Sequence, residues 1–145
     1  MEVLASNISE TQKLAQEIAS KLKPGDVVAL YGDLGSGKTT FVSMAAKALG
    51  FSARVQSPTF VISRIYQKHD YDSGIKNIHH IDLYRVQDKK EVVDLGLEEY
   101  FAQTNSIVFI EWPEAAESIL PKRVIKIYFE IVDEDTRRIY VQNLY

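Results

Sequence analysis

Gly32-Asp33-Leu34-Gly35-Ser36-Gly37-Lys38-Thr39 matches the pattern Gly-x-x-x-x-Gly-Lys-Ser/Thr at every position. Residues 26–31, directly before it, form a nearly continuous apolar run, as in a strand that is buried on both faces. Residues 38–49, directly after it, carry apolar side chains at helical spacing and end at Gly50. The sequence therefore predicts a buried parallel strand, a glycine-rich loop and a helix in direct succession.

The residues of this loop are suited to binding the phosphates of a nucleotide. The glycines permit unusual dihedral angles, so successive backbone N–H groups can converge on phosphate oxygens at the positive end of the following helix. Lys38 would lie between the β- and γ-phosphates, Thr39 would ligate Mg²⁺, and Thr40 would add a phosphate contact. We expect ATP and Mg²⁺ to be bound by residues of this stretch: Asp33, Leu34, Gly35, Ser36, Gly37, Lys38, Thr39 and Thr40.

Such a site also needs an acid at the end of a neighbouring strand, to hold Mg²⁺ and to polarise an attacking water. Glu111 follows the apolar residues 107–110, in the arrangement called Walker B, and is the stronger candidate. Asp82 follows residues 78–81 on another expected strand. Either acid could instead cap a helix or pair with Arg85. We expect three catalytic residues, Lys38, Asp82 and Glu111, and three metal ligands, Thr39, Asp82 and Glu111.

Three neighbouring features have roles that the sequence leaves open. Strand alternation puts His80 on the same face as Asp82, where it could act as an acid or base; packing is the commoner role of a lone histidine, and we leave it outside the catalytic set. Residues 57–59 are extended because of Pro58, so Thr59 could reach the γ-phosphate or belong to an ordinary turn. Trp112 could stack on a base or close the edge of the core.

The remaining patterns predict a single domain, residues 1–145, of the α/β class. A capping-box pattern at Ser9 predicts a helix from about residue 10 to 23, and a second one at Asp88 predicts a short helix. The other expected elements are strands at 60–66, 78–83 and 107–110, a helical turn at 97–103, and a hairpin over 124–131 and 139–141. We expect a P-loop NTPase fold: a mixed central β-sheet with helices on both faces and a C-terminal antiparallel hairpin.

Composition excludes several classes of protein. The net charge is −3 and no segment gathers five or six basic residues, which disfavours a free-standing binder of DNA or RNA. The chain has no cysteine, and its longest apolar run is five residues, whereas a membrane span needs about 20. No secretory signal pattern opens the sequence, so we expect a cytoplasmic protein without membrane contact.

Five short motifs, taken in order, resemble those of the TsaE family, also called YjeE. They are Gly-Asp-Leu-Gly-Ser-Gly-Lys-Thr-Thr at 32–40, Ser-Pro-Thr-Phe at 57–60, His-Ile-Asp-Leu-Tyr-Arg at 80–85, Leu-Gly-Leu-Glu-Glu-Tyr-Phe at 95–101 and Ile-Glu-Trp-Pro-Glu at 110–114. The resemblance implies a cytoplasmic, Mg²⁺-dependent ATPase of weak intrinsic activity. It also implies a role in threonylcarbamoyladenosine (t6A) modification of tRNA, with TsaB and TsaD as partners and with tRNA engaged only indirectly.

The resemblance also carries residue roles. Lys38 and Thr39 match phosphate and metal residues, Asp82 and Glu111 match the essential acids, and residues 57–59 match a switch-like loop. Thr11 and Arg137 are implied to border the nucleotide.

Two other functions remain open at this point. A P-loop small-molecule kinase would start with the same loop but needs an acceptor site and an arginine-rich lid, for which the chain has little room. A non-hydrolytic subunit would use ATP only to order a docking surface, and Glu111 would then be dispensable for hydrolysis. A GTPase is disfavoured, because neither Asn-Lys-x-Asp nor Asp-x-x-Gly occurs.

Overall fold

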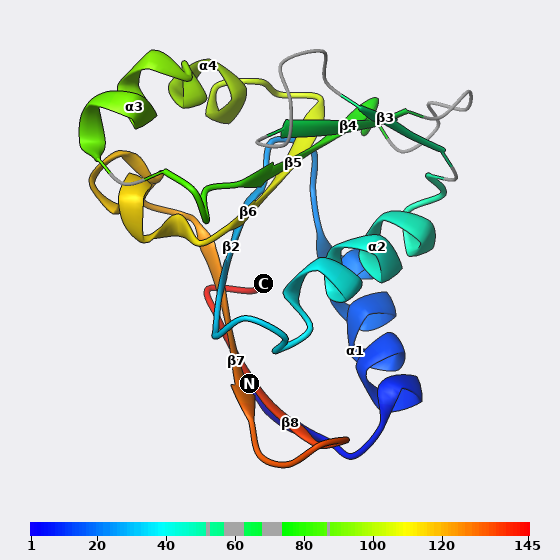
Figure 1. Cartoon of the computed structure of the whole chain (residues 1–145). Helices are drawn as coiled ribbons and strands as arrows, with labels where there is room; N and C mark the ends of the chain where they lie inside the picture. Colours follow the sequence, from blue (N-terminus) through cyan, green and yellow to red (C-terminus); the bar gives the residue numbers. More distant parts are fainter. Residues whose placement is uncertain (52, 57–62, 68–73, 87) are drawn as a thin grey trace.

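The computed structural model describes residues 1–51, 53–56, 63–67, 74–86 and 88–145, which form a mixed β-sheet flanked by helices (Figure 1). The strands are β1 (Glu2–Ala5), β2 (Val27–Tyr31), β3 (Ala53–Gln56), β4 (Ser63–Gln67), β5 (Asn77–Asp82), β6 (Ser106–Glu111), β7 (Ile125–Ile131) and β8 (Arg137–Gln142). The helices are α1 (Ile8–Lys21), α2 (Lys38–Ala48), α3 (Lys89–Asp94), α4 (Leu97–Phe101) and the 3-10 helix η2 (Pro113–Ile119).

The sheet has the order β1-β8-β7-β2-β6-β5-β4-β3 in the described residues. Its central strands β7, β2, β6 and β5 are parallel, and the strands on either side pair antiparallel. The apolar run before the glycine-rich loop is thus a central strand, as predicted. The carboxyl ends of β2, β5 and β6 meet at one edge, where Asp82 and Glu111 are register partners.

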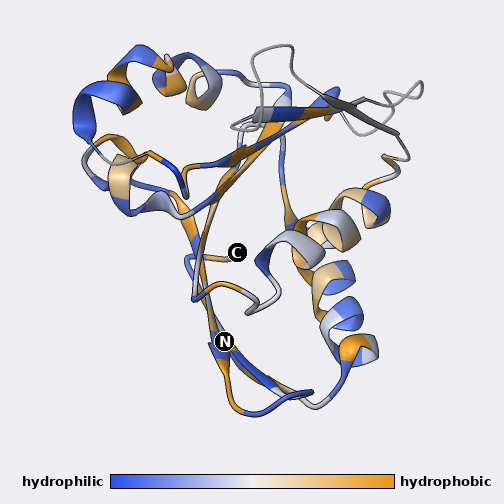
Figure 2. Ribbon diagram, viewed as in Figure 1, coloured by the Kyte–Doolittle hydropathy of each residue, from blue (hydrophilic) through white to orange (hydrophobic). Residues whose placement is uncertain are grey.

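Each face of the sheet has its own hydrophobic layer. Val28 and Leu30 of β2 pack with α1 and α2, whereas Val27 and Ala29 pack with residues of α3, α4 and η2. Figure 1 shows the two groups of helices on opposite sides of the sheet, and Figure 2 shows hydrophobic residues along its central strands. The expected α/β class, the helices on both faces and the antiparallel β7–β8 hairpin are confirmed.

The predicted start of the first helix was wrong by two residues. The N-cap of α1 is Asn7, whose side chain accepts a hydrogen bond of 3.0 Å from the Glu10 backbone N–H. The Glu10 carboxylate in turn accepts one of 2.7 Å from Ser6 N–H. An Asn-x-x-Glu pair therefore displaces the Ser-x-x-Gln pair that begins at Ser9, because asparagine caps at least as well as serine and Glu10 adds a charged acceptor. The second predicted cap, Asp88, is confirmed.

The sequence patterns did not predict three elements. β1 and β3 are four-residue strands at the two edges of the sheet, where pairing with one neighbour is enough and no apolar run is required. The 3-10 helix η2 begins at Pro113, which fits its first turn because proline has no N–H to satisfy. Among the described residues, no helix has both the length and the apolar character needed to cross a bilayer.

Candidate functional site

The glycine-rich loop joins the carboxyl end of β2 to the start of α2. Gly32, Gly35 and Gly37 have φ angles of 150°, 80° and 103°, which side chains rarely tolerate. Gly37 is the N-cap of α2 and has no side chain, so no capping side chain occupies the N–H groups of the first turn. The backbone donors at this helix start are therefore available to an anion.

Two cavities of about 240 Å³ each lie beside the loop and share Gly35, Ser36, Gly37 and Thr40. The acid-side cavity, as we call the first, brings together Leu34, Lys38, Thr39, Asp82, Tyr84, Glu111 and Trp112. The hairpin-side cavity, the second, is lined by Thr11 and Arg137 with parts of the β7–β8 hairpin. Asp33 is exposed and lines neither cavity, although its backbone carbonyl accepts a hydrogen bond from Ser36 N–H.

Lys38, in the first turn of α2, is held under the loop. Its side chain is 4% exposed, its Nζ donates a hydrogen bond to the Gly32 carbonyl, and Nζ lies 3.5 Å from the centre of the Trp112 ring. Burial lowers the pKa of Lys38, although nearby acids, Glu111 first among them, act in the opposite direction. The ammonium group is thus desolvated next to the loop, where its attraction to a phosphate would be stronger than in water.

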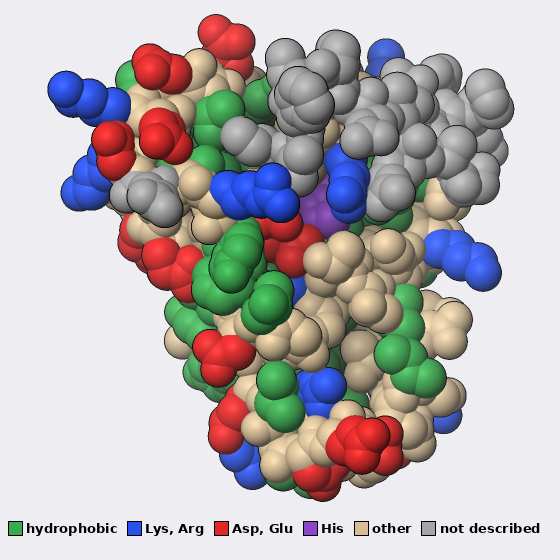
Figure 3. Space-filling model, in the orientation of Figure 1, with side chains coloured by type: hydrophobic (Ala, Val, Ile, Leu, Met, Phe, Trp, Pro, Cys, Tyr) green, Lys and Arg blue, Asp and Glu red, His purple; other side chains and the backbone are tan. Residues whose placement is uncertain are grey.

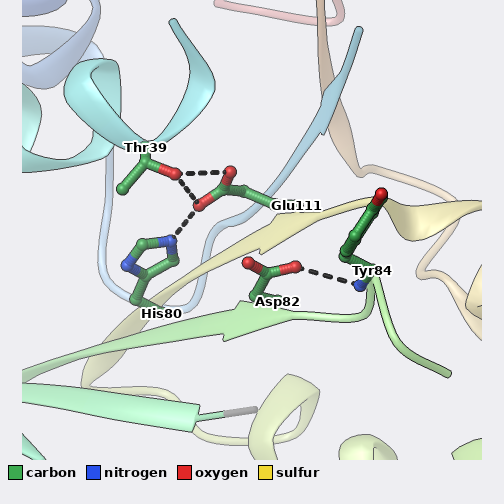
Figure 4. Close-up of polar contacts among 5 residues, drawn as sticks. All are labelled: Thr39, His80, Asp82, Tyr84 and Glu111. Atoms are coloured by element: carbon green, nitrogen blue, oxygen red, sulfur yellow. Dashed lines mark hydrogen bonds and ion pairs between the residues drawn. The ribbon is translucent and has the colours of Figure 1, made fainter. Parts of the chain in front are cut away.

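Glu111 is the centre of a buried polar cluster (Figure 4). Its carboxylate accepts hydrogen bonds from Thr39 Oγ1 at 2.8 and 2.9 Å, and His80 Nε2 lies 2.5 Å from its Oε2. Burial would raise the pKa of Glu111, but the bonds from His80 and Thr39 and the charge of Lys38 outweigh it and lower the pKa. The cluster therefore favours an ionised carboxylate directly beside the start of α2.

Asp82 lines the same cavity but has a different partner. Its Oδ1 accepts a hydrogen bond of 3.0 Å from Tyr84 N–H, which shapes the turn after β5 (Figure 4). No ion pair with Arg85 joins either acid in the part of the chain that the structure describes. The predicted face is correct, because His80 and Asp82 alternate with the oppositely directed Ile81, which packs in the other layer.

The oxygen groups of this cavity fit Mg²⁺, which prefers hard oxygen ligands. Thr39, Asp82 and Glu111 supply a hydroxyl and two carboxylates that line one space. No group of three His, Cys, Asp or Glu side chains able to hold a metal alone occurs within the described ranges. This composition suits an ion that is shared between protein oxygens and substrate phosphates.

Arg137 connects the hairpin to the glycine-rich loop. Its guanidinium donates to the carbonyls of Ser36 at 3.3 Å, Gly35 at 3.4 Å and Asp133 at 2.8 Å. Arg137 and Thr11, which the sequence analysis associated with the nucleotide, thus lie together beside the loop. Thr59 and the rest of residues 57–59 lie outside the described residues.

Removing the Arg137 side chain is expected to loosen this connection. Arg137→Ala should lower the free energy of unfolding by about 2 kcal/mol, since several hydrogen bonds to loop carbonyls are lost together. Urea unfolding followed by circular dichroism measures it. Within the described residues, the neighbouring Arg138 forms only surface ion pairs, with Glu2 and Glu130, so Arg138→Ala should cost less than about 1 kcal/mol. Equal losses in the two variants would contradict a special connection through Arg137.

The sequence analysis named three further residues of the site but did not predict their contacts. His80 contacts Glu111, and Trp112 covers Lys38 with a left-handed backbone (φ 55°) and packs against Tyr84 with ring centres 5.0 Å apart. The Ser36 hydroxyl is buried and has no hydrogen-bond partner among the described residues. The order Glu-Trp-Pro after an apolar strand was the available signal for Trp112, but no local pattern indicated that its ring would lie over Lys38.

Comparison with known proteins identifies relatives of the whole chain. The family model described as threonylcarbamoyl adenosine biosynthesis protein TsaE matches residues 5–139. The chain belongs to the TsaE family. The tRNA threonylcarbamoyladenosine biosynthesis protein TsaE of Bacillus subtilis is 40% identical over 133 residues, which are 92% of this chain and 79% of that protein. The TsaE protein of Aquifex aeolicus is 37% identical over 142 residues, covering 97% and 94% of the two chains.

A solved structure agrees with this membership. The crystal structure of Bacillus subtilis YdiB superimposes with a TM-score of 0.75 and 32% identity, over 96% of this chain and 82% of that one. The matched region of the TsaE model includes the whole glycine-rich loop, both acids and Arg137. The family expected from the five motifs is therefore confirmed.

The entry to the loop of this TsaE family member is tightly packed. A Cβ added at Gly32 would lie 2.7 Å from the Phe129 carbonyl and 2.7 Å from Ser36 Oγ, on a φ of 150°. Gly32→Ala should therefore lower the free energy of unfolding by about 3 kcal/mol, from strain and overpacking together. Gly35→Ala is the matched control. The φ of Gly35 is also positive, but no atom of the described residues beyond its chain neighbours would lie within 4 Å of the added Cβ, so the change should cost about 1 kcal/mol. Chemical denaturation compares them, and equal costs would refute the close packing at Gly32.

Proposed function

We propose that this chain is a Mg²⁺-dependent ATP-binding protein with weak ATPase activity that acts in t6A biosynthesis, as a single domain with the P-loop NTPase fold. The observation that carries the proposal is the carboxylate of Glu111, bonded to Thr39 at the start of α2 and placed beside the buried Lys38. A glycine-rich loop, a buried lysine, a helix-start hydroxyl and an acid from a neighbouring strand are the parts that phosphoryl-transfer sites combine. Membership of the TsaE family supplies the pathway.

In the proposed mechanism, the loop N–H groups and Lys38 bind the phosphates of ATP. Thr39, Glu111 and Asp82 would hold Mg²⁺, which when bound neutralises charge on the phosphate oxygens. Glu111 would orient the attacking water, because its ionised carboxylate can accept a hydrogen bond from a water O–H in the cavity. Tyr84 and Trp112 line the cavity, where their rings would limit the contact of bulk water with the phosphates.

The same geometry supports weak activity in the isolated protein. Glu111 is engaged by Thr39 and His80, so it must exchange the Thr39 bond before it can act on another group. We propose that TsaB and TsaD, acting in the cytoplasm, favour this exchange and so stimulate hydrolysis. The tRNA chemistry would then belong to the partners, and this chain would contact tRNA only indirectly.

Phosphate release from Mg·ATP tests the proposal, with the pure protein alone and with TsaB, TsaD and tRNA. Slow release that rises with the partners is expected. GTP should be a poorer substrate, and release should stop when Mg²⁺ is removed. Transfer of phosphate to a small acceptor without response to the partners would instead assign a kinase, and ATP binding without release in the full mixture would assign a non-hydrolytic docking subunit.

A further inference from the structure

His80 and Glu111 form a buried pair between adjacent strands. Their side chains are 2% and 3% exposed, and the distance from His80 Nε2 to Glu111 Oε2 is 2.5 Å. In the β5–β6 register His80 lies opposite Phe109, so Glu111 is its diagonal neighbour two residues further along β6. Both residues point to the face that carries α2, because the intervening residues Ile81 and Ile110 pack in the opposite layer.

A buried carboxylate needs fixed partners to stay ionised and oriented. Among the described residues, Glu111 has two hydrogen-bonding partners, Thr39 from α2 and His80 from β5. Thr39 is exposed at the loop and is the residue expected to turn toward a bound ligand. His80 lies in the middle of the sheet, with its ring near that of Tyr66, and has no part in the phosphate-binding loop. It is therefore the partner that can keep Glu111 in place while Thr39 exchanges.

We propose, resting on the function above, that His80 is a positioning residue: its Nε2–H holds the Glu111 carboxylate toward Thr39 in the acid-side cavity. In the space-filling view, acidic, histidine and basic side chains lie close together near the middle of the face (Figure 3). Histidine suits the task, since a ring nitrogen on a stiff strand gives a directed donor with few rotatable bonds.

The neighbouring histidine provides a matched control. His79 is 5% exposed and directly precedes His80 on β5, so strand alternation points it to the other face. Its Nε2 lies 3.0 Å from Gln103 Oε1, and its ring packs against Tyr100 at 4.7 Å. Neither contact reaches Glu111 or the glycine-rich loop. A change at His79 thus removes a buried, hydrogen-bonded ring from β5 without touching the site.

Three variants test the proposal: His80→Leu, which removes the donor; His80→Gln, whose amide can donate from a similar distance; and His79→Leu. In the partner-stimulated assay His80→Leu should lower kcat by about 10- to 100-fold, as loss of a supporting hydrogen bond at a metal ligand does, with little change in KM. The Mg²⁺ concentration that gives half-maximal ATP affinity in calorimetry should rise several-fold. His80→Gln should recover most of both losses, and His79→Leu should change neither beyond about twofold.

A spectroscopic measurement separates this proposal from the proposed function. Long-range ¹⁵N–¹H spectra of the nucleotide-free protein should show a proton on His80 Nε2, and Glu111→Gln should shift the His80 ring nitrogens but not those of His79. Two results would overturn the positioning role: His80 ring-nitrogen shifts that do not change in Glu111→Gln, or equal kcat losses in His80→Leu and His79→Leu. If wild-type protein shows no turnover with its partners but the spectra behave as expected, the proposed function fails while the His80–Glu111 contact stands.

Discussion

Lys38→Ala is expected to weaken ATP binding by about 100-fold or more, because the variant loses the one buried cation that faces the loop among the described residues. The ammonium group is already desolvated and lies between the Gly32 carbonyl and the Trp112 ring. Binding therefore exchanges one polar partner for phosphate oxygens without a large further loss of hydration. Charge-assisted hydrogen bonds of this kind contribute about 1.5 to 3 kcal/mol each, and the ammonium can make more than one. Titration calorimetry with Mg·ATP gives the affinity directly.

Lys47→Ala is the matched control for this experiment, since Lys47 is exposed in the last turn of the same helix. Its ATP affinity should equal that of the wild type. Lys38→Ala should lower the free energy of unfolding much less than it lowers the free energy of ATP binding, because a buried charge costs free energy in the folded state. Unchanged ATP affinity in a folded Lys38→Ala protein would contradict the proposal that the glycine-rich loop binds the nucleotide.

Local patterns in the sequence were sufficient for the centre of the fold. The apolar run that became β2, the loop glycines and the stripe of α2 are each encoded within a few neighbouring residues, where periodicity and chain chirality act directly. Glu111 and Asp82 were chosen because each stands at the end of a predicted strand, and parallel strands end at a common edge. The pairing of these strands then brings both acids to the acid-side cavity.

The contacts that complete the site are long-range and had no local signal. The His80–Glu111 pair depends on the β5–β6 register, and a shift of one residue would have turned His80 to the other face. The contact between Arg137 and Ser36 spans 101 positions of sequence. Trp112 has a left-handed backbone conformation, which is rare for a bulky residue, so its backbone preference alone would not predict this conformation. These features follow from packing of the whole domain.

Glu111→Gln is expected to leave ATP affinity within about threefold of wild type and to lower partner-stimulated kcat by at least about 100-fold. Glutamine keeps the volume of the side chain and can still accept from Thr39, so the buried cluster should remain assembled. It lacks the negative charge that would hold Mg²⁺ and orient a water. A loss of that charge affects the transition state more than the bound ground state, so kcat should fall while KM changes little. Steady-state phosphate release with TsaB, TsaD and tRNA measures both parameters.

Glu117→Gln is the control. Glu117 lies in η2 outside the cavity and forms hydrogen bonds with Lys126 and Tyr31, so the variant should keep wild-type turnover. Asp82→Asn, measured beside them, distinguishes the two acids. Asp82 is bonded to the Tyr84 backbone and not to Thr39, so its loss should affect kcat less than the loss of Glu111. Wild-type turnover in Glu111→Gln together with a large loss in Asp82→Asn would transfer the metal and water-orienting roles to Asp82, and the Glu111–Thr39 bond would then be a feature of the fold alone.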